Sequence, residues 1–191
     1  LLQAQEAIRQ DRAAEAIPVL EQILSGSETG YVPVEGQVGL HVPLKRAAAI
    51  LLQSLQPEAQ AMFEAWCAGK AVRRLDDALS QRDRQELLRI VQEYPTTAFA
   101  AQAALALAAD AWDRGSGEQA GYWAEKLLQC PAADKNLQTQ AWLLIAAAHQ
   151  QAGRKEQARQ AFQHALALAP EGKLRIGADL APKEKAIDGL M

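Results

Sequence analysis

Apolar residues recur at spacings of three and four over most of the chain, which is the period of an amphipathic α-helix. The first such run covers residues 1–24, and a polar turn at Gln10 and Asp11 divides it, so this run predicts a helical hairpin. The second helix of the hairpin is expected to begin near Ala13. A start there would place Pro18 near the first turn, where a proline costs no backbone hydrogen bond.

The pattern changes over residues 25–43, where glycines alternate with valines. Alternation with a period of two is typical of strands, and clustered glycines are typical of turns. This segment is therefore predicted as one long Gly/Val-rich loop, with or without a short β-hairpin that turns at Glu35 and Gly36.

The helical period returns at residue 44 and continues to Pro170, with breaks at prolines, glycines and polar turns. The last part of the chain differs, because residues 173–176 alternate like a strand and residues 183–190 fit a short closing helix. The fold class predicted is all-α. The helices are expected over residues 44–55, 57–79, 84–93, 96–113, 118–129, 135–152 and 154–169.

Composition agrees with a helical globular chain. The 191 residues are 49% hydrophobic and 23% charged, which is unlike disordered, collagen-like or membrane-spanning sequences. Aromatic residues make up only 5%, so the core must be built mainly from aliphatic residues, among which Ala and Leu are conspicuous. Twenty Lys and Arg against 23 Asp and Glu leave a net charge of −3, and the clustered cations typical of a nucleic-acid-binding protein are missing.

A spaced pattern in residues 139–172 resembles a tetratricopeptide (TPR) repeat, a helical hairpin of 34 residues. His149 stands where that repeat usually has an aromatic residue. The matching aromatic, large apolar, small, glycine and proline positions are Trp142, Ile145, Ala146, Gly153, Ala158, Phe162, Ala165 and Pro170.

Residues 101–134 resemble a more degenerate copy of the same repeat, in which Trp123 lies one place from the expected aromatic position. Ala120 and Ala158 are equivalent and 38 residues apart (158 − 120), so about four residues are inserted between the two copies. Residues 1–24 fit the end of another unit, whereas residues 58–95 fit least well. The positions that agree in the degenerate copy are Leu107, Ala108, Gly115, Ala120 and Leu127.

The TPR resemblance implies a right-handed stack of helical hairpins, an α-solenoid whose groove recognises a protein or a peptide. It implies a scaffold rather than an enzyme, with no cofactor. An open end of such a stack is capped by its own tail or by a second copy, so self-association is also open. The expected divisions are a first hairpin (1–24), the long loop (25–43), divergent hairpins (44–95), two TPR-like repeats (96–172) and a non-repeat segment (173–191).

The repeat register assigns ten residues of two first helices to the groove. They include no Lys or Asn pair, so the chain departs from the TPR subclass that clamps a terminal carboxylate. Trp112 is either an anchor for an apolar helix or extended segment, or a residue that packs against the preceding hairpin. The groove candidates are Gln102, Leu105, Ala109, Trp112, Asp113, Gln140, Leu143, Ala147, Gln150 and Gln151.

A looser resemblance covers the whole chain. The chain has, in order, an AIPVLEQIL hairpin, a Gly/Val-rich loop, a VPLKRAAAILLQSL helix, the segment KAVRRLDDALSQRDRQELLRIVQEYPTT, repeat-like hairpins and a KLRIG segment. This order is similar to the helical region before PQQ-like β-propellers in large planctomycete envelope proteins. This resemblance implies the alternative function, an accessory arm that positions an attached domain. If this resemblance holds, the protein is expected in the cell envelope or periplasm. If it does not, the protein is expected in the cytoplasm. Because the chain begins with Leu1, we expect a fragment or a mature form.

Motifs for catalysis or metal binding are incomplete. A phosphate-binding loop ending at Gly69 and Lys70 would need a glycine and a hydroxyl residue where Glu64 and Ala71 stand. The histidines, His41, His149 and His164, lack the spacing of zinc ligands, so structural or surface roles are expected. Cys67 and Cys130 are too few for a disulfide framework, and a free thiol on an apolar helix face is usually a core residue.

Charged residues of both signs alternate between Arg73 and Arg89. Their helical spacing favours a solvated face with salt-bridge pairs. A patch that binds a charged partner is the sharper alternative, because mixed charges discriminate between partners.

Overall fold

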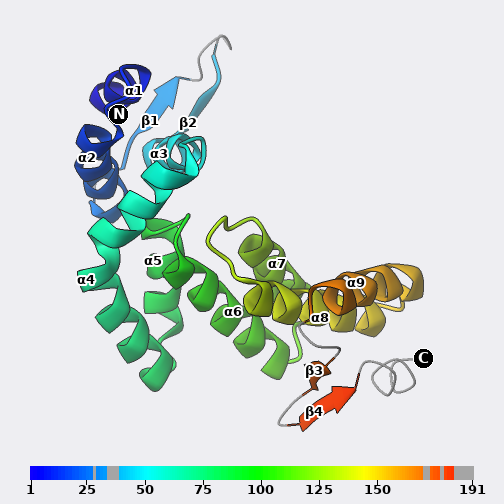
Figure 1. The fold of residues 1–191 in the computed structure, drawn as a ribbon. Helices are drawn as coiled ribbons and strands as arrows, with labels where there is room; N and C mark the ends of the chain where they lie inside the picture. Colours follow the sequence, from blue (N-terminus) through cyan, green and yellow to red (C-terminus); the bar gives the residue numbers. More distant parts are fainter. Residues whose placement is uncertain (28, 34–38, 170–172, 177–178, 183–191) are drawn as a thin grey trace. The chain divides into compact units, whose positions relative to one another are not determined.

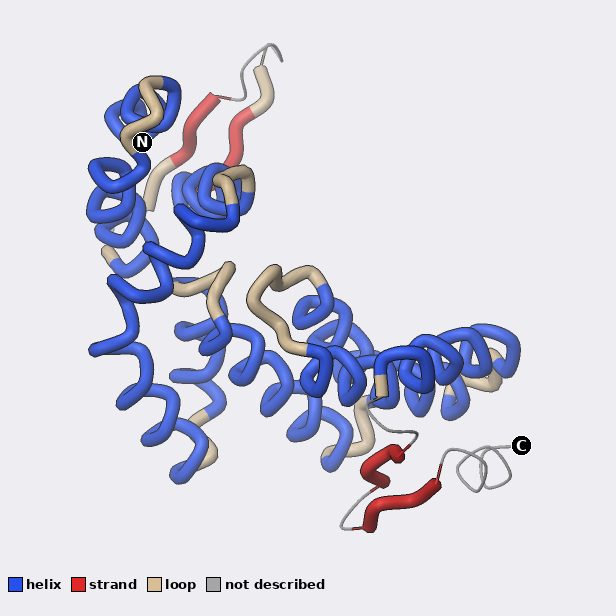
Figure 2. The backbone as a smooth tube through the Cα atoms, in the orientation of Figure 1, coloured by secondary structure: helices blue, strands red, loops and turns tan. Residues whose placement is uncertain are grey.

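The computed structural model describes residues 1–27, 29–33, 39–169, 173–176 and 179–182, and most of these residues are helical (Figure 2). The predicted all-α class is therefore confirmed. Contacts divide the chain into two compact units, Leu1–Ala103 and Ala104–Met191, with the boundary inside one helix. Among the described helices, none has both the length and the apolar character that crossing a bilayer requires.

The first unit is organised around α2, which contacts the helices on either side of it in sequence and both helices of a later hairpin (Figure 1). Its buried residues include Ala16, Leu20 and Leu24. The elements are α1 (Leu2–Arg9), α2 (Ala13–Ser25), β1 (Tyr31–Pro33), β2 (His41–Pro43), α3 (Leu44–Gln53), α4 (Pro57–Gln81), α5 (Arg84–Glu93) and the start of α6 (Ala98–Asp113).

The expectation for Pro18 was wrong in one respect. Helix α2 does begin at Ala13, but Pro18 is its sixth residue and lies in the interior. A proline at that position has no N–H for the carbonyl of Ala14, so one intrahelical hydrogen bond is lost. The buried neighbours Ile17 and Leu20 keep this segment helical through packing despite that loss.

The long loop contains a short antiparallel strand pair, β1 and β2, with Val32 opposite Val42. A hydrogen bond from the Leu44 N–H to the Gly30 carbonyl, 2.8 Å long, closes the base of the pair. The turn predicted at residues 35–36 lies outside the described residues.

The second unit continues α6 and adds three helices, followed by a strand pair (Figure 1). Strand β3 was predicted, but its antiparallel partner β4 was not. The helix predicted over 183–190 lies outside the described residues. The elements are α7 (Gly117–Leu128), α8 (Lys135–Gln151), α9 (Lys155–Leu168), β3 (Lys173–Ile176) and β4 (Asp179–Pro182).

Four helical hairpins turn in the same way. In each, one residue adopts left-handed backbone conformation: Asp11 (φ 57°), Arg82 (φ 52°), Gly115 (φ 77°) and Gly153 (φ 73°). The N–H of that residue donates to the carbonyl three positions earlier, and the next N–H donates to the carbonyl five positions before it, at 2.8 to 2.9 Å. This pair of bonds is the Schellman motif, which satisfies carbonyls at a helix C-terminus.

Core positions also recur when the hairpins are aligned on this turn. Five residues after the left-handed residue, Ala16, Leu87, Ala120 and Ala158 are all buried. Four residues before it, three hairpins have a buried alanine, and the fourth has His149. The last three turns are separated by 33 residues (115 − 82) and 38 residues (153 − 115). Residues 58–95, which fit the repeat least well by sequence, therefore contain a hairpin with the same turn.

Candidate protein-interaction site

All ten groove candidates are accessible to some degree. Five are exposed and five are half-buried, and they lie on α6 and α8. Gln102 belongs to the first unit, and the other nine belong to the second. The exposed five are Gln102, Ala109, Asp113, Gln150 and Gln151; the half-buried five are Leu105, Trp112, Gln140, Leu143 and Ala147.

Two of these candidates, from different helices, meet at Gly117, the first residue of α7. A Cβ atom built on Gly117 would lie 2.1 Å from Oε1 of Gln151 and 3.6 Å from a ring carbon of Trp112. The missing side chain of Gly117 is thus what allows the Gln151 amide to reach the start of α7. This junction, formed by Trp112, Gly117 and Gln151, is called the Gly117 junction below.

A pocket of about 550 Å³ lies beside the Gly117 junction. Gln151 is the one groove candidate that lines it, and Gly117 forms part of its wall. The remaining lining comes from the two Schellman turns of the second unit and their neighbours: Gly115, Ser116, Glu118, Ala148, Ala152 and Arg154. The lining includes a carboxylate, Glu118, and a guanidinium, Arg154, beside small apolar surfaces. It therefore suits a polar side chain of a partner better than a purely apolar one.

The start of α7 contributes backbone as well as side chains to the pocket. Ser116 occupies the N-cap position, but its hydroxyl makes no capping hydrogen bond. By contrast, Asp83 caps α5 with bonds of 3.0 and 3.1 Å, and Asp134 caps α8 with a bond of 2.7 Å. The repeat pattern identified Gly115 as its turn glycine, but the part that residues 115–117 take in a pocket had no signal in the sequence.

Aromatic residues of the second unit are paired. Trp142 stacks on His164 with ring centroids 4.5 Å apart, which joins α8 to α9. Tyr122 packs edge-on against Trp123 at 5.0 Å, and the Lys126 ammonium lies 5.8 Å from the Tyr122 ring. His164 therefore has a structural partner, in agreement with the structural or surface role expected for it.

His149 has an unusual environment. Its Nδ1 atom is buried and has no hydrogen-bond partner among the residues that the structure describes. Buried ring nitrogens usually have a partner, because an unpaired polar atom has lost its water without compensation. The other three hairpins avoid this problem with alanine.

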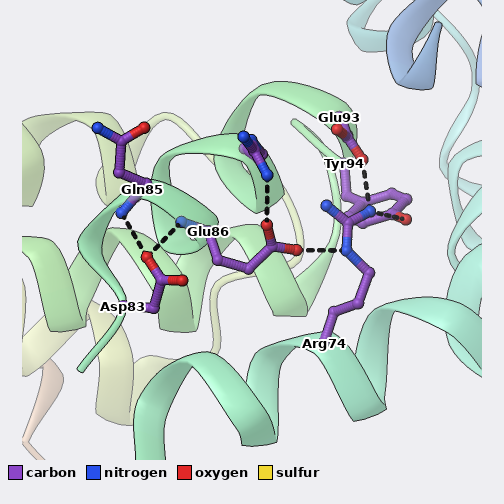
Figure 3. Close-up of polar contacts among 7 residues, drawn as sticks. Arg74, Asp83, Gln85, Glu86, Glu93 and Tyr94 are labelled. Atoms are coloured by element: carbon purple, nitrogen blue, oxygen red, sulfur yellow. Dashed lines mark hydrogen bonds and ion pairs between the residues drawn. The ribbon is translucent and has the colours of Figure 1, made fainter. Parts of the chain in front are cut away.

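The first unit contains a polar cluster that links α4 to α5 (Figure 3). The Arg74 guanidinium donates to Glu86 at 2.6 Å, to Glu93 at 2.5 Å and to the Tyr94 hydroxyl at 3.0 Å. Side chains of Glu86 and Glu93 are only 20% and 13% exposed. The salt-bridge pairs predicted for this charged run are present, but Arg74 and Glu86 are only 31% and 20% exposed rather than fully solvated, because the turn at Arg82 folds α5 back and carries Glu86 onto α4.

Burial and hydrogen bonding together shift the pKa values of Arg74 and Tyr94 in this cluster. Burial tends to lower the pKa of Arg74, but its hydrogen bonds to Glu93 and Glu86 outweigh that effect and raise the pKa above its usual value. Burial raises the pKa of the Tyr94 hydroxyl, against the opposing charge of Arg74. The cluster holds Arg74 charged and Tyr94 protonated near neutral pH.

Cys67 lies on the buried side of α4 and is 2% exposed. Burial raises the pKa of its thiol to about 12; the charge of Glu21 adds to the increase and that of Lys70 opposes it. A thiolate is the reactive form of cysteine, so this thiol is unreactive near neutral pH. Cys130 is also buried and forms no disulfide within the described residues. The described part of the chain has no group of three or more metal-ligating side chains.

Comparisons of the chain with protein-family models, with curated proteins and with solved structures gave no match. The functional argument therefore depends on the geometry of the chain itself.

Proposed function

We propose that the chain is a TPR-like stack of helical hairpins that binds a protein or peptide partner at the Gly117 junction and along the adjoining faces of α6 and α8. The stack is supported by the shared Schellman turns, their spacing of 33 and 38 residues and the recurring buried positions. The α-solenoid and its right-handed twist are part of this proposal.

One observation carries the binding function. Trp112 from α6 and Gln151 from α8 converge on Gly117 beside a pocket, and both side chains remain accessible. A half-buried Trp gives a large apolar contact, and an amide offers both a donor and an acceptor for a peptide backbone. Such an aromatic anchor beside a polar pocket is typical of peptide recognition.

The test uses peptides selected from a display library on the full chain, with affinities measured by calorimetry. The decisive variant is Gly117→Ala, because its new Cβ would collide with Oε1 of Gln151 and displace that amide. We expect it to weaken binding by about tenfold, and Trp112→Ala by a similar factor.

Gly121→Ala is the matched control. It adds the same methyl group to the same helix, where the new Cβ would make an ordinary contact of 3.5 Å with Ala148. We expect affinity within about twofold of the unsubstituted chain. Failure to select any peptide, or equal affinity for the Gly117 and Gly121 variants, would contradict the proposed function.

A further inference from the structure

The polar side chains that line the pocket beside the Gly117 junction make no side-chain hydrogen bond or ion pair within the described part of the chain. Arg114, just before the pocket, shows the usual alternative, because its guanidinium binds the Asp110 carboxylate at 2.9 Å. The pocket therefore contains polar groups that are free to bind a ligand. These side chains are Ser116, Glu118, Gln151 and Arg154.

Two of these side chains carry opposite charges and come from different helices. Glu118 is the second residue of α7, and Arg154 directly precedes α9. Both are exposed, and they line one pocket without forming an ion pair with each other. The other residues of the lining are uncharged, so the pocket presents one positive and one negative group that do not neutralise each other.

A partner that carries both charges fits this pair best. A lone carboxylate would be attracted by Arg154 but repelled by Glu118, and a lone cation would meet the reverse situation. An apolar side chain would take water away from both charges without replacing it. Opposite charges on the partner give each pocket charge a counterpart, and the Ser116 hydroxyl and the Gln151 amide supply further donors and acceptors.

We propose that the partner is a peptide segment that places one acidic and one basic side chain in this pocket, the acidic one against Arg154 and the basic one against Glu118. The inference rests on the proposed function, since it names the chemistry of the partner at that site. Because the two pocket charges belong to different helices, the pair also sets the direction in which the peptide binds. Mixed charges contribute mainly to such specificity and less to affinity.

The pocket has room for two side chains. Its volume of about 550 Å³ lies within the range of roughly 300 to 1,000 Å³ that is usual for ligand sites. Side chains on one side of a peptide are about 7 Å apart at positions i and i+2 of an extended strand, and about 6 Å apart at i and i+4 of a helix. The spacing between the acidic and the basic residue therefore distinguishes an extended partner from a helical one.

Peptides selected from a display library on the full chain test the proposal, with affinities measured by calorimetry. We expect an acidic and a basic residue to recur in the selected peptides at one of these two spacings. Arg154→Glu and Glu118→Arg each place like charges together, so each should weaken binding by about tenfold.

Matched controls make the same charge changes outside the pocket. Arg159→Glu on α9 and Glu125→Arg on α7 alter exposed residues that do not line it, and affinity should stay within about twofold of the unsubstituted chain. Circular dichroism of each variant confirms that it remains folded.

The double variant, Glu118→Arg with Arg154→Glu, gives the sharpest test. A peptide whose acidic and basic residues are exchanged should bind it within about threefold of the original affinity, whereas the original peptide should bind it weakly. Selected peptides without a recurring charge pair would overturn the inference, as would pocket reversals no larger than the controls.

Failure of this inference can be told apart from failure of the proposed function. Peptides that lose affinity with Gly117→Ala but with neither pocket charge reversal would overturn the inference and leave the proposed function standing. Failure to select any peptide would contradict both.

Discussion

The hairpins α4–α5 and α8–α9 have the same backbone turn but hold their helices together differently. Between α4 and α5, Arg74 binds two carboxylates and the Tyr94 hydroxyl. The α8–α9 hairpin instead buries small residues such as Ala158 and Ala165 beside Phe162. The Schellman turn fixes how the chain reverses, and either small residues or a polar cluster can then fill the space. A hairpin whose helices are joined by a polar cluster, such as α4–α5, does not match a repeat pattern that is defined by small residues.

Removal of the Arg74 side chain should produce the largest difference in stability between the α4–α5 and α8–α9 hairpins. Arg74→Ala leaves Glu93 without its cation and Glu86 with Arg89 as its cation, at 3.3 Å, and both carboxylates are poorly exposed. We therefore expect the first unit to lose about 2 kcal/mol of stability, less than for a fully buried pair. Chemical denaturation measures the change. Arg73→Ala, at the neighbouring exposed position, is the control and should change stability by less than about 0.5 kcal/mol.

Alkaline pH should also lower the stability of the α4–α5 hairpin, which contains Cys67. Because the folded chain holds the Cys67 thiol proton up to a pKa of about 12, the unfolded chain releases that proton first as the pH rises. Stability is therefore complete below the ordinary thiol pKa and falls above it, by up to about 1.4 kcal/mol per pH unit.

Urea denaturation between about pH 8 and 10 tests this dependence, before Tyr94 contributes strongly. Cys67→Ala should have the flatter profile. Equal slopes for the substituted and unsubstituted chains would show that the thiol does not titrate differently on unfolding.

Glycine substitutions at the turns test whether the backbone motif is equivalent in both hairpins. Gly153→Ala places a side chain at φ 73° and should cost about 1 kcal/mol. Arg82 already has a side chain in that conformation, so Arg82→Gly should stabilise the α4–α5 hairpin by up to about 1 kcal/mol. Thermal unfolding measures both. A loss of stability in Arg82→Gly would mean that the arginine side chain contributes more than its backbone conformation costs.

The smallest effect is expected at the position where α8–α9 departs from the other hairpins. His149→Ala removes a buried nitrogen that has no hydrogen-bond partner among the described residues. It introduces the alanine that the other three hairpins have at the equivalent positions, Ala7, Ala78 and Ala111. We expect a gain of about 0.5 to 1 kcal/mol, seen as a higher melting temperature. A lower melting temperature would instead show that the imidazole ring fills space that a methyl group leaves empty.

Local signals predicted the helices well. Helix α5 begins and ends where its polar turn and proline place it, and Gly115 and Gly153 mark two turns correctly. Asp11 and Arg82 form the same turn without glycine, so composition gave no sign of their left-handed conformation. Strand β4 was missed because a four-residue strand ending in proline has almost no periodic signal.

Contacts between distant residues were harder to predict. The Arg74 cluster joins residues up to 20 apart, and helical periodicity reports only neighbours within a few turns. The position of Gln151 against Gly117 depends on how two turns, 38 residues apart, lie in space. The ten groove candidates came from the repeat register, which places residues on a helix face but cannot reveal a pocket beside it.

The strand pair β1–β2 has a consequence for the evolution and engineering of the chain. The Leu44–Gly30 hydrogen bond and the pairing of β1 with β2 hold the two ends of the connection between α2 and α3 close together. The distance between these ends therefore does not depend on how many residues lie between β1 and β2. If the number of residues between Pro33 and His41 were increased by insertion, each doubling should cost only about 0.6 kcal/mol of closure entropy. This position can therefore accept a foreign sequence, such as an epitope or a small domain, while the hairpins stay as they are.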